Sequence, residues 1–206
     1  LDMPMSDSLT LSISASIEKP IPYFKPLSIS TDQRVQSIHP GRAYYAHDKD
    51  TFPLVLKPSD SSGFNFFIDF DWQPATSYTF FLPEGLVESY HGTKSEMKVL
   101  EVVTDDEDNY STLYLELIDW SGQPSILQLE LEGEIIDKQY LKSTEPAQLV
   151  FQHLAPGKYD FRLIYDRNKN GKWDIADFDS GIPAEKVRLM SEGVETKRGF
   201  DFEVEW

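Results

Sequence analysis

The chain has 206 residues, of which 40% are hydrophobic and 13% aromatic, and this composition can fill one large or two smaller cores and excludes global disorder. Its formal net charge of −16, from 35 acidic and 19 basic residues, argues against nucleic acid and anionic membrane surfaces as partners. The absence of cysteine excludes disulfides, thiolate nucleophiles and Cys-based zinc sites within the chain.

The N-terminal half has the hydrophobic pattern of short strands. In LTLSISASI, residues 9–17, Leu, Ile and Ala occupy alternate positions, which predicts a half-buried strand. Pro20, Pro22 and Pro26 then exclude a helix. Because Leu1 is not Met and a strand pattern follows almost at once, we expect a fragment of a longer protein. Further strand-like runs are FPLVLKP, FNFFIDFDW, YTFFLP and MKVLEVV.

The acidic stretch TDDEDN, residues 104–109, interrupts this pattern. Like charges favour a solvated, extended linker, so we place a domain boundary here, with domains at 1–104 and 105–206. A long surface loop within one sandwich is the alternative.

Strand patterns resume in the second half. The runs are STLYLELID, SILQLELEG, AQLVFQHL, KYDFRLIYD, EKVRLM and GFDFEVEW, and no segment has a helical period longer than two turns. Strands at this spacing, broken by turns, indicate β-sandwiches. The predicted fold class is all-β, with two tandem β-sandwiches.

The segment DRNKNGKWDIAD has the ligand spacing of a calcium loop. A 12-residue loop of this type binds through positions 1, 3, 5, 7, 9 and 12 and has Gly at position 6. Gly171 stands at that position, and the expected ligands, with Lys172 acting through its carbonyl, are Asp166, Asn168, Asn170, Lys172, Asp174 and Asp177. The ion would be weakly bound and structural, with a dissociation constant of roughly 10⁻⁴ to 10⁻³ M.

A turn without metal explains the same residues. Asn170-Gly171 is a type I′ hairpin signal, and Asp and Asn side chains stabilise turns through bonds to nearby backbone groups. Asp177 is also one methylene shorter than the usual Glu at position 12, and strands, not helices, flank the segment. Both interpretations stay open at this point.

No catalytic residues emerge, and we expect no enzyme. The chain contains no G-x-S-x-G, P-loop or dinucleotide motif, and its four histidines lack zinc-ligand spacing. Tyr44 and Tyr45, in a segment expected to be a loop between strands, and Trp120 could form a carbohydrate platform. Burial in a core is the favoured interpretation for these aromatic residues.

Two segments resemble known β-sandwich families. WQPATSYTFFLPEGLVESYHG resembles the bacterial Ig-like domains of surface proteins, with matching positions at Pro74, Thr76, Tyr78, Gly85 and Gly92. LVFQHLAPGKYDFRLIYD resembles the prealbumin-like sandwich of Cna-B and carboxypeptidase-regulatory type, through Phe151, Leu154, Pro156, Gly157, Tyr159 and Phe161. The two together are similar to the C-terminal region of Ig-like-domain lipoproteins of Gram-negative bacteria.

The resemblance implies an Ig-like domain followed by a prealbumin-like one, in a protein exported to the periplasm or the outer-membrane surface. It implies a non-enzymatic structural or presentation module; an adhesin or carbohydrate-binding module that uses loops at the sandwich ends is the alternative. The expected partner is an unknown protein or glycan. We expect a monomer that does not insert into a membrane, because no apolar run approaches ~18 residues.

Overall fold

A computed structural model describes residues 11–13, 20–39, 41, 43–68, 71–142 and 148–206, and the structural statements below concern these residues. Of the strand expected over 9–17, residues 11–13 form β1 (Leu11–Ile13), and the rest lies outside the described residues. Short strands joined by turns make up nearly all of the regular structure, so the predicted all-β class is confirmed. Within the described ranges, no helix has the length and apolarity needed to cross a bilayer.

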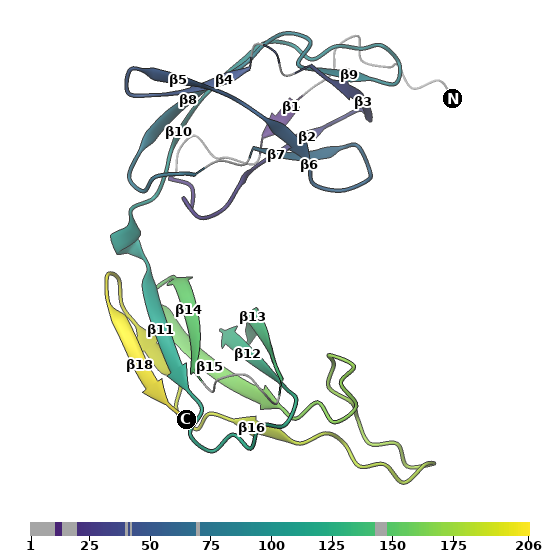
Figure 1. Ribbon diagram of the computed structural model, residues 1–206, viewed down its shortest axis with the longest axis vertical. Coiled ribbons are helices and arrows are strands. Elements are labelled where there is room, and N and C mark those ends of the chain that lie inside the picture. The colour runs from purple at the N-terminus through teal and green to yellow at the C-terminus, as the bar shows by residue number, and fades with distance from the viewer. Residues whose placement is uncertain (1–10, 14–19, 40, 42, 69–70, 143–147) are drawn as a thin grey trace. The chain divides into compact units, whose positions relative to one another are not determined.

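The chain divides into two compact units, Leu1–Asp106 (unit 1) and Glu107–Trp206 (unit 2). The division falls inside the acidic stretch 104–109. Unit 2 begins with η1 (Glu107–Asn109), a turn of 3-10 helix that joins the two units (Figure 1).

Unit 1 is built from antiparallel strands in two four-stranded sheets, ordered β1-β2-β7-β6 and β10-β8-β4-β5, and a separate β3-β9 pair. Beyond β1, its strands are β2 (Leu27–Thr31), β3 (Val35–Ile38), β4 (Tyr44–His47), β5 (Asp50–Pro53), β6 (Leu56–Pro58), β7 (Asn65–Ile68), β8 (Ser77–Leu82), β9 (Val87–Ser89) and β10 (Lys98–Val103).

The two four-stranded sheets of unit 1 face each other across one core. Alternation along β8 buries Tyr78, Phe80 and Leu82, which share a cluster with residues of β2 and β7 such as Ile29 and Ile68. Burying such a side chain contributes about 1.5–3 kcal/mol relative to leaving it exposed. The Tyr78 hydroxyl, at the edge of this core, accepts the Gln73 N–H at 2.8 Å.

The loop expected around Tyr44 and Tyr45 is a strand, so that prediction was wrong. β4 pairs with β5 from Tyr44↔Pro53 to His47↔Asp50, which leaves a two-residue turn. Asp48 in this turn has a φ of 53°. Asp tolerates the left-handed region better than most residues, and this allows a tight hairpin without glycine.

Unit 2 has a three-stranded sheet, ordered β14-β11-β18, and a second sheet ordered β13-β12-β15-β16 in which β17 also pairs with β15. β11 and β18 run parallel, and the other pairs are antiparallel. The strands are β11 (Ser111–Glu116), β12 (Ser125–Leu131), β13 (Glu134–Leu141), β14 (Gln148–Leu154), β15 (Gly157–Ile164), β16 (Val187–Leu189), β17 (Val194–Thr196) and β18 (Asp201–Glu205).

A second, separate core lies between these sheets. Leu113 and Leu115 of β11 are fully buried in one cluster with Leu127 and Leu129 of β12. Gly157, at the start of β15, lies so close to this core that a Cβ would stand 2.7 Å from a methyl carbon of Leu131. The Pro-Gly turn therefore needs its glycine for packing space.

β12 is buried on both faces. Ile126, only 1% exposed, points away from the core leucines and lies beside Tyr140 of β13 and Ile164 of β15. Tyr140 in turn packs against Gly171, where a Cβ would stand 3.3 Å from a ring carbon. The connection between β15 and β16 therefore covers part of the outer face of this sheet.

A β-bulge interrupts the pairing of β11 with β14. Ser111 pairs with Leu154 and Leu113 with Phe151, so β14 carries one extra residue across this step. His153 takes the left-handed conformation there, with a φ of 56°, and its ring lies edge-to-face against Tyr110 at 6.3 Å.

The environment of His153 predicts a pH-dependent stability of unit 2. Burial lowers the pKa of His153, and the charge of Glu107 opposes this effect. Since the folded pKa lies below the unfolded value of about 6.5, protonation favours the unfolded chain, and stability is lost as the pH falls through this range.

We expect the urea midpoint of unit 2 to fall more in wild type than in His153→Asn when the pH is lowered from about 7.5 to about 5. Asn removes the titrating group and tolerates the left-handed conformation. Equal falls in the two proteins would contradict this role of His153.

Candidate functional site

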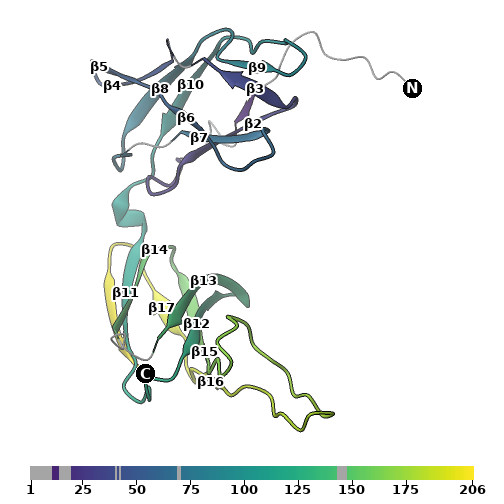
Figure 2. The ribbon, with the colours of Figure 1, turned by 45° about the vertical axis from the view of Figure 1, so that its right-hand side comes forward.

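Residues 165–186 connect β15 to β16 and contain all six expected metal ligands. Figures 1 and 2 show this connection, in green to yellow, extending away from the sheets of unit 2. Two carboxylates stand at its base, those of Asp166 and Glu185, and each residue is only 6% exposed. The path of the connection depends on the backbone N–H groups whose hydrogen bonds these two carboxylates accept.

The Asp166 carboxylate closes the first turn of the connection. Its two oxygens accept the backbone N–H groups of Asn170 at 3.1 Å and Gly171 at 2.8 Å. The bend requires left-handed backbone at Lys169 and at Gly171, with φ values of 61° and 75°. Because Asn170 is not among the described residues with positive φ, the expected type I′ turn at Asn170-Gly171 is wrong: the bend is closed by Asp166.

Asn168, Asn170 and Asp174 meet on the exposed side of the same bend. One carboxylate oxygen of Asp174 accepts the side-chain amide of Asn168 at 2.5 Å and that of Asn170 at 2.8 Å. The Lys172 N–H donates to Asn170 Oδ1 at 2.8 Å. Positions 1, 3, 5 and 9 of the expected loop therefore lie in one hydrogen-bonded cluster.

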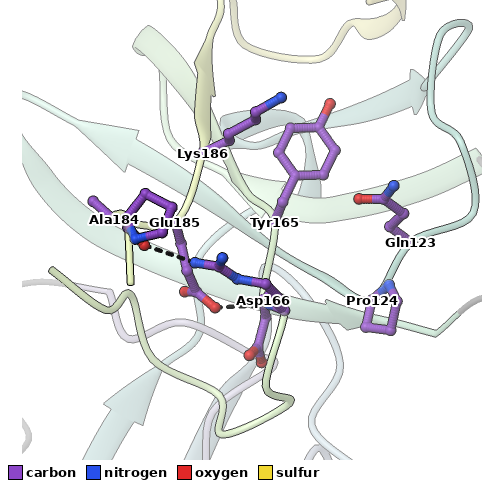
Figure 3. Close-up of a pocket in the computed structure, with 9 residues that line it drawn as sticks. Gln123, Pro124, Tyr165, Asp166, Ala184, Glu185 and Lys186 are labelled. Atoms are coloured by element: carbon purple, nitrogen blue, oxygen red, sulfur yellow. Dashed lines mark hydrogen bonds between the residues drawn. The ribbon is translucent and has the colours of Figure 1, made fainter. Parts of the chain in front are cut away.

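Glu185 completes the base of the connection and was not identified from the sequence. Its carboxylate accepts the N–H groups of Arg167 at 2.7 Å and Asp174 at 3.2 Å. Its own N–H donates to the Asp174 carbonyl at 3.0 Å, and its carbonyl accepts the Trp173 indole N–H at 3.1 Å. In Figure 3 the carboxylates of Asp166 and Glu185 point in the same direction from neighbouring segments.

Asp177 lies outside this cluster, in a turn of its own. It pairs with Ile182 through two backbone hydrogen bonds of 2.8 and 2.9 Å, and its carboxylate accepts the hydroxyl of Ser180 and the N–H groups of Asp179 and Ser180. These bonds, above all the one from the Ser180 hydroxyl, lower the pKa of Asp177 below its usual value. Of the five side chains expected as ligands, the structure thus brings together four and places the fifth, Asp177, in another turn.

The cluster offers a calcium ion a donor set that fits in part. Calcium takes six to eight oxygen ligands, and the chain brings carboxylates from Asp166 and Asp174 and amides from Asn168 and Asn170 to one bend. The carboxylates of Asp166 and Glu185 are already occupied by backbone N–H groups. Among the described residues, no group of three or more His, Asp or Glu side chains is placed to hold a metal ion.

A solvent-open depression of about 490 Å³ lies beside this base (Figure 3). Tyr165, Arg167 and Lys186 line it from the connection, and Gln123 and Pro124 line it from the opposite side. The Arg167 guanidinium donates to the Pro183 carbonyl at 2.7 Å, so this cation is used to hold the connection.

The aromatic residues singled out from the sequence lie in packed arrangements. Tyr44 stacks on Phe81 of β8 with ring centroids 5.0 Å apart, and Tyr45 stacks on Phe52 of β5 at 5.1 Å. Trp120 packs against the core of unit 2, and its indole N–H donates to the Gln123 carbonyl at 3.0 Å.

A scan against protein-family models found no match, and neither did a search of curated proteins. Among solved structures, the chain is similar to the TIE protein of Bacillus anthracis, with 9% identity and a TM-score of 0.30 over 99% of this chain and 41% of that one. It is also similar to BcpA, the major pilin subunit of Bacillus cereus, with 10% identity and a TM-score of 0.29 over 96% of this chain and 70% of that one. The chain thus spans about two fifths of the TIE protein chain, and likenesses this distant say nothing of what it does.

Removing the Glu185 carboxylate is expected to loosen the connection. Glu185→Ala leaves the N–H groups of Arg167 and Asp174 without their acceptor. Because both hydrogen bonds are only partly buried, the cost for each is at most the ~1–3 kcal/mol of a fully buried donor. Glu185→Gln keeps one acceptor oxygen and should cost less. Limited proteolysis within residues 172–184 and the urea unfolding free energy of unit 2 measure the effect. Unchanged cleavage in Glu185→Ala would show that the connection is held by other contacts.

Proposed function

We propose that the chain is a non-enzymatic structural and presentation module of an exported bacterial cell-envelope protein. The observation that carries this proposal is that each unit closes its own apolar core between two sheets. A chain of separately cored sandwiches fits a role as spacer, because each unit has an apolar core of its own. The resemblance to Ig-like and prealbumin-like surface domains supplies the expected location.

The connection 165–186 supports the presentation part of the proposal. Its base is fixed by two buried carboxylates, while Phe178 farther along it is 92% exposed and Ile175 is 71% exposed. A rigid base resists local opening and therefore proteolysis, which suits a segment displayed outside the cell.

The alternative, a glycan-binding or adhesive module, is favoured by one observation, the partly exposed aromatic rings of Tyr44 and Phe52. Sugar binding needs aromatic faces that are free. However, Tyr44 is stacked on Phe81, and Phe52 on Tyr45, with ring planes 21° apart and centroids 5.0 and 5.1 Å apart. Each ring therefore covers part of the face of its partner. Cross-strand packing that stabilises the sheet accounts for this geometry better.

The proposed location can be tested with antibodies raised against this chain and applied to the cells that naturally produce it. We expect labelling of intact cells, or labelling that appears once the outer membrane alone is permeabilised. Labelling that requires lysis of the inner membrane would overturn the proposal.

Calcium binding remains a prediction, and the geometry supplies a matched pair of variants for its test. In thermal melts from EDTA to about 10 mM calcium, we expect a saturable rise in Tm with a midpoint of roughly 10⁻⁴ to 10⁻³ M. Asp174→Ala should abolish the rise, because Asp174 is the meeting point of both asparagine amides. Asp177→Ala should retain it, because Asp177 belongs to another turn. A flat response in wild type would leave the bend as a hydrogen-bonded turn.

A further inference from the structure

The first and last strands of unit 2, β11 and β18, lie side by side and run parallel (Figures 1 and 2). Five consecutive residue pairs join them, from Thr112↔Asp201 to Glu116↔Glu205. Backbone hydrogen bonds extend the ladder at both ends: the Gly199 N–H donates to the Tyr110 carbonyl at 3.0 Å, and the Trp206 N–H donates to the Glu116 carbonyl at 2.8 Å. The Ile118 N–H donates in turn to the Trp206 carbonyl at 2.9 Å.

We propose that the β11–β18 ladder is a mechanical clamp that makes unit 2 resistant to tension applied along the chain. This inference deepens the proposed structural role and rests on it for its biological use. The resistance of the ladder to tension depends only on the strand topology of unit 2.

The direction of the strands determines how a load reaches their hydrogen bonds. Because β11 and β18 are parallel, a pull on the chain before β11 and a pull after β18 act in opposite directions along the two strands. Such a load shears the ladder, so all of its evenly spaced bonds resist together. Two neighbouring strands pulled from the same end would instead separate one pair at a time.

Side-chain packing prevents the ladder from sliding under load. Leu113 and Leu115 of β11 are fully buried, and Phe202 and Val204 of β18 pack against the same core. A one-residue slip would turn every side chain of β18 to the other face of the sheet. Sliding of the two strands past each other by single residues is therefore disfavoured.

Trp206 anchors the far end of the ladder. Its indole lies 6.2 Å from the ring of Phe161 in β15, and the Arg188 guanidinium stands 4.6 Å over it. Load that arrives at the end of β18 is thereby shared with the opposite sheet as well as with β11.

Single-molecule pulling on the full chain tests the clamp by changing the direction in which load reaches the β11–β18 ladder. Since the chain has no cysteine, introduced thiols give unique handles. The shear variant carries Glu107→Cys and one cysteine added after Trp206. The peel variant carries Glu107→Cys and Lys197→Cys, which places both handles at the same end of the ladder. Glu107 and Lys197 are both exposed, so these changes leave the cores intact.

We expect the rupture force at one pulling rate to be several-fold higher for the shear variant than for the peel variant. Each event should release about 3.3–3.6 Å per residue between the handles, which identifies unit 2 as the unit that opened. Equal urea unfolding free energies of the two variants, expected because both share every core residue, would exclude a difference in stability.

Equal rupture forces in the two directions would overturn the clamp. That outcome would leave the cellular location untouched, since the antibody experiment tests it separately. Conversely, a cytoplasmic location would remove the proposed role and leave a measured difference in force standing.

Discussion

The buried carboxylates of Asp166 and Glu185 hold the connection between β15 and β16 in place. A carboxylate removed from water is costly unless it is hydrogen-bonded, and each of these two accepts a pair of backbone N–H groups. These hydrogen bonds also give acceptors to backbone N–H groups that would otherwise have none in this irregular, partly buried segment. Through Gly171, which packs on Tyr140 of β13, the same bend covers part of the outer face of this sheet.

Local periodicity was enough to predict the fold class and most strands of unit 2. The buried face of β11 and β12 can be read from their alternating leucines, and that of β15 from its alternating aromatic residues. β13 was missed because its side chains are nearly all exposed and Ile135 and Ile136 are adjacent, so its sequence has no alternation. The β4–β5 hairpin has no glycine in its two-residue turn, so its sequence lacks the usual signal for a hairpin.

At the candidate site, too, sequence patterns predict only contacts between residues that are close along the chain. Asp166, Asn168, Asn170 and Asp174 were identified because they are close in sequence and the bend that joins them is local. Glu185 binds the same bend from the end of the connection, just before β16, and no spacing rule connects residues 174 and 185. Asp177 has the right spacing but lies near Ser180, whose hydroxyl and N–H give its carboxylate a closer set of donors.

An ion and the hydrogen bonds described here place different demands on the same bend. Asp174 now accepts two amide N–H groups, whereas calcium would need the oxygens of those amides. Rotating an Asn amide exchanges its nitrogen and oxygen without moving the backbone, which Asp166 and Glu185 fix independently. The backbone of the bend therefore has its fold without an ion. The free energy of calcium binding would be limited by the small number of carboxylate ligands in the bend. A site of this kind would add stiffness to a turn that already folds, while folding itself depends on the two cores.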